Sequence, residues 1–160
     1  MNTIIINPKT DIVFDDKVRE MCITCKRYGK KATCPPHIEE TSHYKRLLLS
    51  YKYGIIYYDT YKVIVGEQES SRRSSISLHK VILSEKKRIF NEGHYFIFGL
   101  GAGSCKLCKK CVFPCAYPEK ALIPMEATGI DVVETMRRKG VIIKFPVIDH
   151  FYRIGGIFYD

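Results

Sequence analysis

Seven cysteines gathered in two short segments constrain this chain more than any other feature. The first segment contains Cys22, Cys25 and Cys34, and the second contains Cys105, Cys108, Cys111 and Cys115. An odd number of cysteines argues against a framework of disulfides and indicates metal or redox chemistry. Thiols that were buried only for packing would not be confined to two segments. The seven cysteines are therefore predicted to be metal ligands.

The second segment has the spacing Cys-x2-Cys-x2-Cys-x3-Cys, which is typical of bacterial iron–sulfur ferredoxins. A loop that presents one thiolate at every third residue wraps around a cubane [4Fe-4S] cluster and reaches three of its corners. In such loops the fourth cysteine usually binds a second cluster. Zinc is the alternative, although a single zinc ion usually takes two ligands from each of two loops.

The first segment supplies three thiolates and needs a fourth ligand. On the ferredoxin pattern this ligand is Cys115, so that Cys22, Cys25, Cys34 and Cys115 hold one cluster while the other three cysteines hold a second. His37 follows Cys34 by three residues, and a zinc site made of three cysteines and this histidine is the alternative. Two clusters, one cluster with a zinc ion, and a single cluster all fit the spacing.

The composition predicts a folded domain without a membrane span. Of the 160 residues, 46% are hydrophobic and 27% are charged, which suits one domain over residues 1–160. No apolar run approaches the roughly 18 residues of a membrane span. The N-terminus lacks the basic and apolar regions of a signal peptide. We therefore expect a cytoplasmic protein.

The formal net charge of +9 is concentrated in part beside the cysteines. The flanking cations are Lys26, Arg27, Lys30, Lys31, Lys106, Lys109 and Lys110. Nearby cations favour the thiolates that metals bind, and they suit an acidic redox partner, such as a flavodoxin, or a client enzyme. The charge does not by itself indicate nucleic-acid binding, because an anionic cofactor would offset part of it.

Hydrophobic periodicity predicts alternating strands and helices. Strands are expected at residues 3–6, 12–14, 54–65, 94–100 and 141–148, and helices at 39–51, 77–91 and 131–139, with a polar loop at 67–75. The order strand, helix, strand after residue 54 indicates βαβ units. The predicted fold class is α/β, with a small, mainly parallel sheet and two cysteine-rich metal-binding loops.

Several ordered motifs resemble a known protein family. They are Cys22-Ile-Thr-Cys25 with Tyr28-Gly29 and Cys34-Pro35-Pro36, Leu100-Gly-Ala-Gly-Ser-Cys105, Cys115-x-x-Pro118-Glu119-Lys120-Ala121, and Met125-Glu126-Ala127-x-Gly129-Ile130-Asp131-Val132. On these residues the chain resembles the uncharacterised predicted metal-binding domain family of archaea and anaerobic bacteria. The resemblance covers about residues 20–140. It implies metal binding through the cysteines in an anaerobic organism, and no particular reaction.

Three functions fit these observations. The first is an iron–sulfur protein, with one or two [4Fe-4S] clusters per chain, that carries single electrons or reductively activates a partner. The second is an enzyme that uses a cluster iron with an open corner as a Lewis acid, with Glu126 and Asp131 as candidate general acid or base. Both carboxylates could instead stabilise a helix N-terminus. The third is a zinc-binding regulatory or nucleic-acid module, for which the net charge is the only argument.

Overall fold

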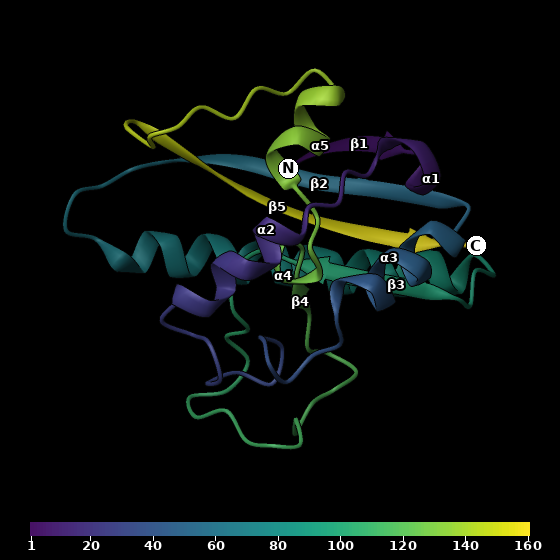
Figure 1. The fold of residues 1–160 in the computed structure, drawn as a ribbon, viewed down its shortest axis with the longest axis horizontal. Coiled ribbons are helices and arrows are strands. Elements are labelled where there is room, and N and C mark those ends of the chain that lie inside the picture. Colours follow the sequence, from purple (N-terminus) through teal and green to yellow (C-terminus); the bar gives the residue numbers. More distant parts are fainter.

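A five-stranded sheet lies at the centre of the computed structural model, which describes residues 1–160 (Figure 1). Its strands are β1 (Asn2–Ile6), β2 (Tyr53–Lys62), β3 (Ile97–Gly101), β4 (Ile123–Pro124) and β5 (His150–Tyr159), in the order β1-β2-β5-β3-β4. Only the β3–β4 pair is parallel, and the β1–β2, β2–β5 and β3–β5 pairs are antiparallel. The predicted α/β class is confirmed, whereas the prediction of a mainly parallel sheet is wrong.

The last strand, β5, explains the difference. Both β2 and β3 are antiparallel to β5, so they run in the same direction as each other, as the βαβ pattern predicts. They do not pair, because β5 lies between them. Residues 141–148, where the last strand was predicted, form no strand. Gly155 and Gly156 lower the strand propensity of β5 itself, yet Gly155 is needed there, because a Cβ would lie 2.8 Å from the carbonyl oxygen of Leu100.

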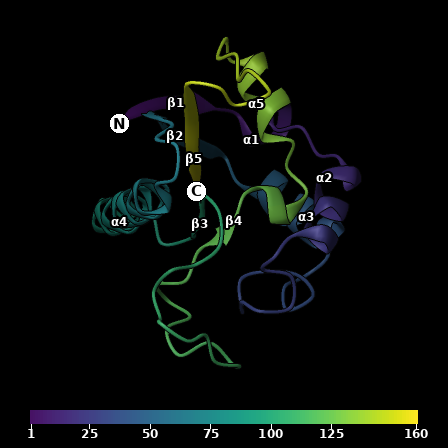
Figure 2. The same ribbon diagram turned by 90° about the vertical axis from the view of Figure 1, so that its left-hand side faces the viewer.

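The helices lie on both faces of the sheet. They are α1 (Pro8–Asp11), α2 (Asp16–Glu20), α3 (Thr41–Ser50), α4 (Gln68–Asn91) and α5 (Val132–Arg138), with the short 3-10 helices η1 (Met21–Thr24) and η2 (Glu126–Thr128). Figure 2 shows α4 on one face and α1, α2, α3 and α5 on the other. The helices predicted at 39–51 and 131–139 are confirmed as α3 and α5. The strand predicted at 12–14 is reduced to a single bridge between Phe14 and Ile130.

The first two turns of α4 replace the loop that was predicted at residues 67–75. Their polar side chains hold the helix by hydrogen bonds rather than by apolar contacts. The Ser75 hydroxyl donates to the carbonyl oxygen of Ala102 at 2.8 Å, and Arg153 Nε on β5 donates to Ser74 Oγ at 2.9 Å. Because these contacts are polar, hydrophobic periodicity does not show this part of the helix.

Two apolar layers form the core, one on each face of the sheet. On the α4 face the buried residues are Tyr57, Leu78, Ile82, Ile89, Leu122 and Ile157. On the other face they are Ile6, Ile12, Leu48, Tyr51, Ile56, Leu100, Met125, Ile130, Val132, Met136, Ile154 and Phe158. Successive residues such as Ile56 and Tyr57 point to opposite faces, as the alternation of a strand requires. No helix is long and apolar enough to cross a membrane.

Both cysteine segments lie outside these layers, beyond the β3–β4 edge of the sheet. We call residues 21–37 and 102–121 together the cysteine lobe. Figures 1 and 2 both show its two segments side by side below the sheet. Apart from η1, the lobe contains no helix or strand. Residues 102–121 occupy the crossover between the parallel strands β3 and β4, where a helix is the usual connection.

Candidate metal centre

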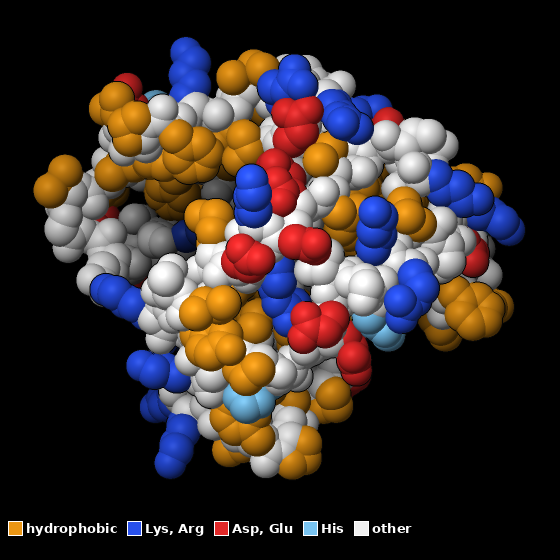
Figure 3. All heavy atoms as spheres, in the orientation of Figure 1, with side chains coloured by type: hydrophobic (Ala, Val, Ile, Leu, Met, Phe, Trp, Pro, Cys, Tyr) orange, Lys and Arg blue, Asp and Glu red, His pale blue; other side chains and the backbone are white.

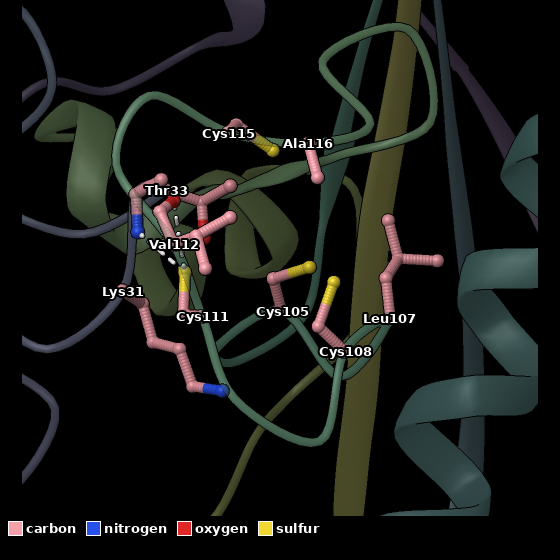
Figure 4. Close-up of a pocket in the computed structure, with 10 residues that line it drawn as sticks. Lys31, Thr33, Cys105, Leu107, Cys108, Cys111, Val112, Cys115 and Ala116 are labelled. Carbon is pink, nitrogen blue, oxygen red and sulfur yellow. Dashed lines mark hydrogen bonds between the residues drawn. The ribbon is translucent and has the colours of Figure 1, made fainter.

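The four cysteines of the second segment line one pocket, which we call the four-cysteine pocket. Its walls contain Cys105, Cys108, Cys111 and Cys115, together with Lys31, Ala32 and Thr33 of the first segment (Figure 4). The thiols of Cys105 and Cys108 point toward one another, and Cys111 and Cys115 lie across the pocket from them. All four predicted ligands of this segment therefore share one site.

One group of the first segment points at sulfur in this pocket, and a second group that belongs to a lining residue is unpaired. The backbone N–H of Ala32 donates to Cys111 Sγ at 3.3 Å. The hydroxyl oxygen of Thr33 is buried and has no hydrogen-bond partner, although buried hydroxyls are normally paired. Hydrogen bonds to sulfur are one of the means by which proteins tune iron–sulfur clusters. These donors therefore fit a sulfur-rich group in the pocket.

Cys22, Cys25 and Cys34 line a second pocket, which we call the three-cysteine pocket. Cys22 lies on η1, and Cys25 is the first residue after the end of η1. The loop between Cys25 and Cys34 is closed by a hydrogen bond from the Gly29 N–H to the Pro35 carbonyl at 2.8 Å. Gly29 has a φ of +70°, in the left-handed region that favours glycine. The closed loop brings the three thiols to one hollow.

Burial disfavours the ionised form of several of these thiols. It raises the pKa of Cys105, and it raises the pKa of Cys34, where Cys25 and Cys22 add to the rise. For Cys22, burial again raises the pKa, Arg19 lowers it, and the charges of Cys25 and Glu126 raise it further. A metal binds the thiolate, so metal binding at these sites releases protons and depends on pH.

The two pockets lie on either side of the same stretches of backbone. Thr33 lines the four-cysteine pocket, whereas the next residue, Cys34, lines the other. In the same way Ser104 and Cys105 face different pockets. Since consecutive Cα atoms are about 3.8 Å apart, the two sites are immediate neighbours.

The partition of the thiols differs from the ferredoxin pattern. Cys115 lines the pocket of its own segment and not the three-cysteine pocket. The geometry therefore does not support the prediction that Cys115 is the fourth ligand of the metal bound by the first segment. His37, the predicted zinc ligand, does not line the three-cysteine pocket either. Its Nε2 lies 3.0 Å from the Gly29 carbonyl oxygen, and its ring centroid lies 4.3 Å from that of Phe113. His37 thus joins the two segments of the lobe.

The two candidate acid–base residues have different environments. Asp131 is the N-cap of α5, where its carboxylate accepts from the Glu134 N–H at 2.9 Å, so its alternative structural role is confirmed. Glu126 instead lines the three-cysteine pocket. Its side chain is exposed, but the surrounding protein atoms desolvate the carboxyl and raise its pKa, while its own backbone N–H and Arg153 act in the opposite direction.

The thiols line these pockets without converging on one point. No group of three or more His, Cys, Asp or Glu side chains is close enough to hold a single metal ion as it stands. Ligand loops of this kind commonly order around their metal, because binding and folding are coupled. The lobe therefore has the donor set of a metal centre, and binding would require the thiols to move inward.

Comparison with models of protein families matches residues 5–158 to one family, described as "Predicted metal-binding protein (DUF2284)". The chain belongs to this family. The match covers almost the whole chain and confirms the resemblance that the cysteine motifs indicate. The family description names metal binding, and it names no particular metal or reaction. No curated protein and no solved structure matches the sequence.

Some residues that position the site leave little or no signal in the sequence. Thr33 lines the four-cysteine pocket, and its only signal is its place beside Cys34. Lys31, one of the flanking cations, lines the same pocket. Arg19 donates to the carbonyl oxygens of Glu39 and Ala127, which anchors the start of the first cysteine segment to η2. An arginine that binds two distant carbonyls leaves no pattern in the sequence.

Proposed function

We propose that this member of the family binds two [4Fe-4S] clusters, one in each cysteine pocket, and passes single electrons to an acidic protein partner. The observation that carries the proposal is the four-cysteine pocket, in which thiols at ferredoxin spacing surround one hollow. Cys105, Cys108, Cys111 and Cys115 would hold one cluster, and Cys22, Cys25 and Cys34 would bind the other. When bound, such clusters supply reversible one-electron chemistry.

The surroundings of the thiols support this cofactor. The Ala32 N–H donates to Cys111 Sγ, and Thr33, whose hydroxyl has no partner, lines the same pocket. Lys31 and Cys105 line this pocket as well. A cluster with its thiolates carries net negative charge, which donors and cations stabilise. The backbone that the two pockets share would keep the two clusters close, as electron exchange between them requires.

A cavity rich in cations supports the choice of an acidic partner. It has a volume of about 660 Å³ and lies between the first turns of α4 and the lobe. Its lining contains Arg27, Lys31, Arg72, Lys106 and Lys109, two glutamates, and Cys108 of the four-cysteine pocket. Figure 3 shows lysine and arginine side chains along the edge of the lobe at the lower left, with acidic side chains mainly across the middle of the molecule.

Most of these cations have no carboxylate partner. Arg72 pairs with Glu69 at 3.8 Å, but Arg27, Lys31, Lys106 and Lys109 take part in none of the ion pairs of the chain. Burial lowers the pKa of Lys106, and the nearby charges of Arg153 and Arg27 lower it further. Uncompensated positive charge at the mouth of a redox site would attract and orient an acidic protein.

Metal analysis of anaerobically purified protein tests the cofactor. The proposal predicts about eight iron and eight sulfide per chain, with an electron paramagnetic resonance signal on reduction. A colourless protein with zinc and no sulfide would instead favour the zinc module. Preparation without oxygen is essential, because zinc replaces iron that oxidation releases.

Charge reversal tests whether an acidic partner binds at the cation-rich cavity. With a flavodoxin as electron acceptor, Lys109→Glu and Arg27→Glu should each slow electron transfer at low salt by about tenfold and weaken its dependence on ionic strength. Lys87→Glu, an exposed change on the distant part of α4, is the matched control. Equal rates for all three variants, at unchanged metal content, would reject this surface.

The Lewis-acid enzyme is a second candidate because Glu126 lines the three-cysteine pocket. In that function the carboxyl group would hold or move a proton beside an open iron corner. It requires an iron with an exchangeable ligand. A cluster spectrum that changes when a small ligand such as cyanide is added would favour it over electron transfer.

A further inference from the structure

The three-cysteine pocket lacks a fourth thiol but contains one carboxylate. Two closed cubanes need eight ligands, and the chain has seven cysteines, of which four line the other pocket. Besides the three thiols, Glu126 is the only acidic residue that lines this hollow. Glu126 and Cys22 both line this hollow, so the carboxylate and the thiols share one site.

Glu126 reaches the pocket because a seam of hydrogen bonds joins the chain before Cys22 to the chain around η2. The Asp15 N–H donates to the Gly129 carbonyl at 2.9 Å, and the Asp131 N–H donates to the Val13 carbonyl at 2.8 Å. Arg19, three residues before Cys22, donates to the Ala127 carbonyl. This seam holds residues that are about a hundred positions apart in the sequence at one site.

The Glu126 carboxylate is also free to act as a ligand. It takes part in none of the ion pairs of the chain, and its side chain remains open to the hollow. The competing ligands are placed elsewhere, since Cys115 lines the other pocket and His37 is held by Gly29 and Phe113. A carboxylate that lines the same hollow as three thiols and forms no ion pair has the chemistry of a metal ligand.

We propose that Glu126 is the fourth protein ligand of the metal bound by Cys22, Cys25 and Cys34. Its carboxylate oxygen binds the metal corner that the three thiolates leave, so that the chain supplies four ligands in each pocket. This proposal rests on the proposed function for the identity of the metal, but not for the identity of the ligand. It makes the two sites chemically distinct, one with four sulfur ligands and one with three sulfurs and an oxygen.

Substitutions at Glu126 test the ligand role. Glu126→Gln keeps the shape of the side chain and removes the anionic oxygen, so the corner iron that Glu126 binds should be lost. Iron should fall from about eight to about seven per chain, and the paramagnetic resonance signal of this cluster should change. Glu126→Cys supplies a thiolate, so iron should return to about eight, with a changed paramagnetic resonance signal from this cluster. Glu119→Gln, a change in the lobe at an exposed residue that lines neither cysteine pocket, should match the wild type.

Three results would overturn the proposal. The first is a Glu126→Gln protein with full iron and the wild-type spectrum. The second is iron loss in Glu126→Gln that Glu126→Cys does not restore, which would show that the residue only positions the lobe. The third is a wild-type signal that shifts on addition of cyanide, because the corner would then be open. Far-UV circular dichroism checks that each variant is folded.

The ligand role is distinguishable from the iron–sulfur proposal itself. If the wild type holds zinc and no sulfide, the proposed function fails, and Co²⁺ replaces iron as the probe. Glu126→Gln should then bind about one Co²⁺ fewer per chain than the wild type, whereas Glu119→Gln should not. Equal Co²⁺ content in both variants would reject Glu126 as a ligand for either metal.

Discussion

The sheet with its helices and the cysteine lobe are held together in different ways. The sheet region buries large side chains completely, and Ile56, Leu78 and Phe158 each have 0% exposed surface. In the lobe only Thr33, Cys34 and Pro35 are buried in the first segment, and no residue from 102 to 121 is buried. The lobe also lacks strands, and its only regular element is η1.

This difference indicates where the folding free energy of each region comes from. Burial of apolar surface stabilises the sheet region by itself. The lobe buries too little surface to offset the conformational entropy of its ordered loops. Bound metal would supply the missing cross-links, because it would join residues of each segment that are far apart. The lobe should therefore depend on metal and the sheet should not.

The largest expected effect is that of metal removal. Treatment with a chelator should raise hydrogen exchange in residues 21–37 and 102–121 by several orders of magnitude, because these segments have little else to order them. The far-UV circular dichroism of the sheet and of α4 should remain. Complete loss of the dichroism signal would show that the two regions are not separable.

A cavity in the core should have the reverse effect. Phe158 has 0% exposed surface, and Phe158→Ala should lower the free energy of unfolding by about 3–5 kcal/mol. The metal content of the protein that remains folded should not change, since Phe158 lies in the sheet core away from the cysteine pockets. Denaturant unfolding and metal analysis of the same samples measure both quantities. Metal loss in proportion to the loss of stability would contradict the separation.

A smaller effect is expected at the seam between the regions. Gly129 has a φ of +87°, and a Cβ there would clash with Thr41 Cγ2. Gly129→Ala should cost about 1–3 kcal/mol and weaken metal binding in the three-cysteine pocket more than in the other, because Gly129 follows η2 directly. Gly140→Ala is the matched control, since Gly140 has a φ of +84° and open space around it. Equal metal loss from both pockets would reject a role of the seam.

The smallest effect concerns the sheet at alkaline pH. Burial raises the pKa of Tyr57 to about 12, and the charge of Glu85, whose carboxylate accepts from the Tyr57 hydroxyl at 3.1 Å, adds to the rise. The stability that this raised pKa contributes is fully present below pH 10 and is lost as the pH rises toward 12.

Comparison with Tyr57→Phe isolates this contribution, because the other tyrosines are common to both proteins. Between pH 9 and pH 11 the wild type should lose about 1 kcal/mol more than Tyr57→Phe. Urea unfolding at the two pH values measures the difference. Parallel loss in both proteins would show that Tyr57 ionises as easily in the folded state as in the unfolded state.

The sequence allowed α3, α5 and β2 to be predicted because local signals agree there. Asp131 caps α5, and an apolar stripe marks α3. It did not allow β5 or the first turns of α4 to be predicted. In β5 two glycines fit against neighbouring backbone, and in α4 serines bind Arg153 and Ala102. Both features depend on contacts with distant residues.

The candidate site shows the same division. The spacing of the cysteines identified the seven candidate ligands, because a loop that binds a cluster needs thiolates at short intervals. It did not give their partition. The place of Cys115 depends on how residues 102–121 return to the sheet at β4, and the approach of Glu126 to Cys22 depends on the seam at Arg19. Neither is encoded in a short motif.

The partition of the cysteines is the central claim, and the paramagnetic resonance spectrum of Cys115→Ser tests it most directly. Cys22→Ser and Cys108→Ser serve as references, because each should disturb the metal of one pocket only. If the four-cysteine and three-cysteine pockets are separate sites, Cys115→Ser should reproduce the spectrum of Cys108→Ser and leave the other signal intact. If Cys115→Ser instead reproduces the spectrum of Cys22→Ser, Cys115 crosses to the first segment and the partition is wrong.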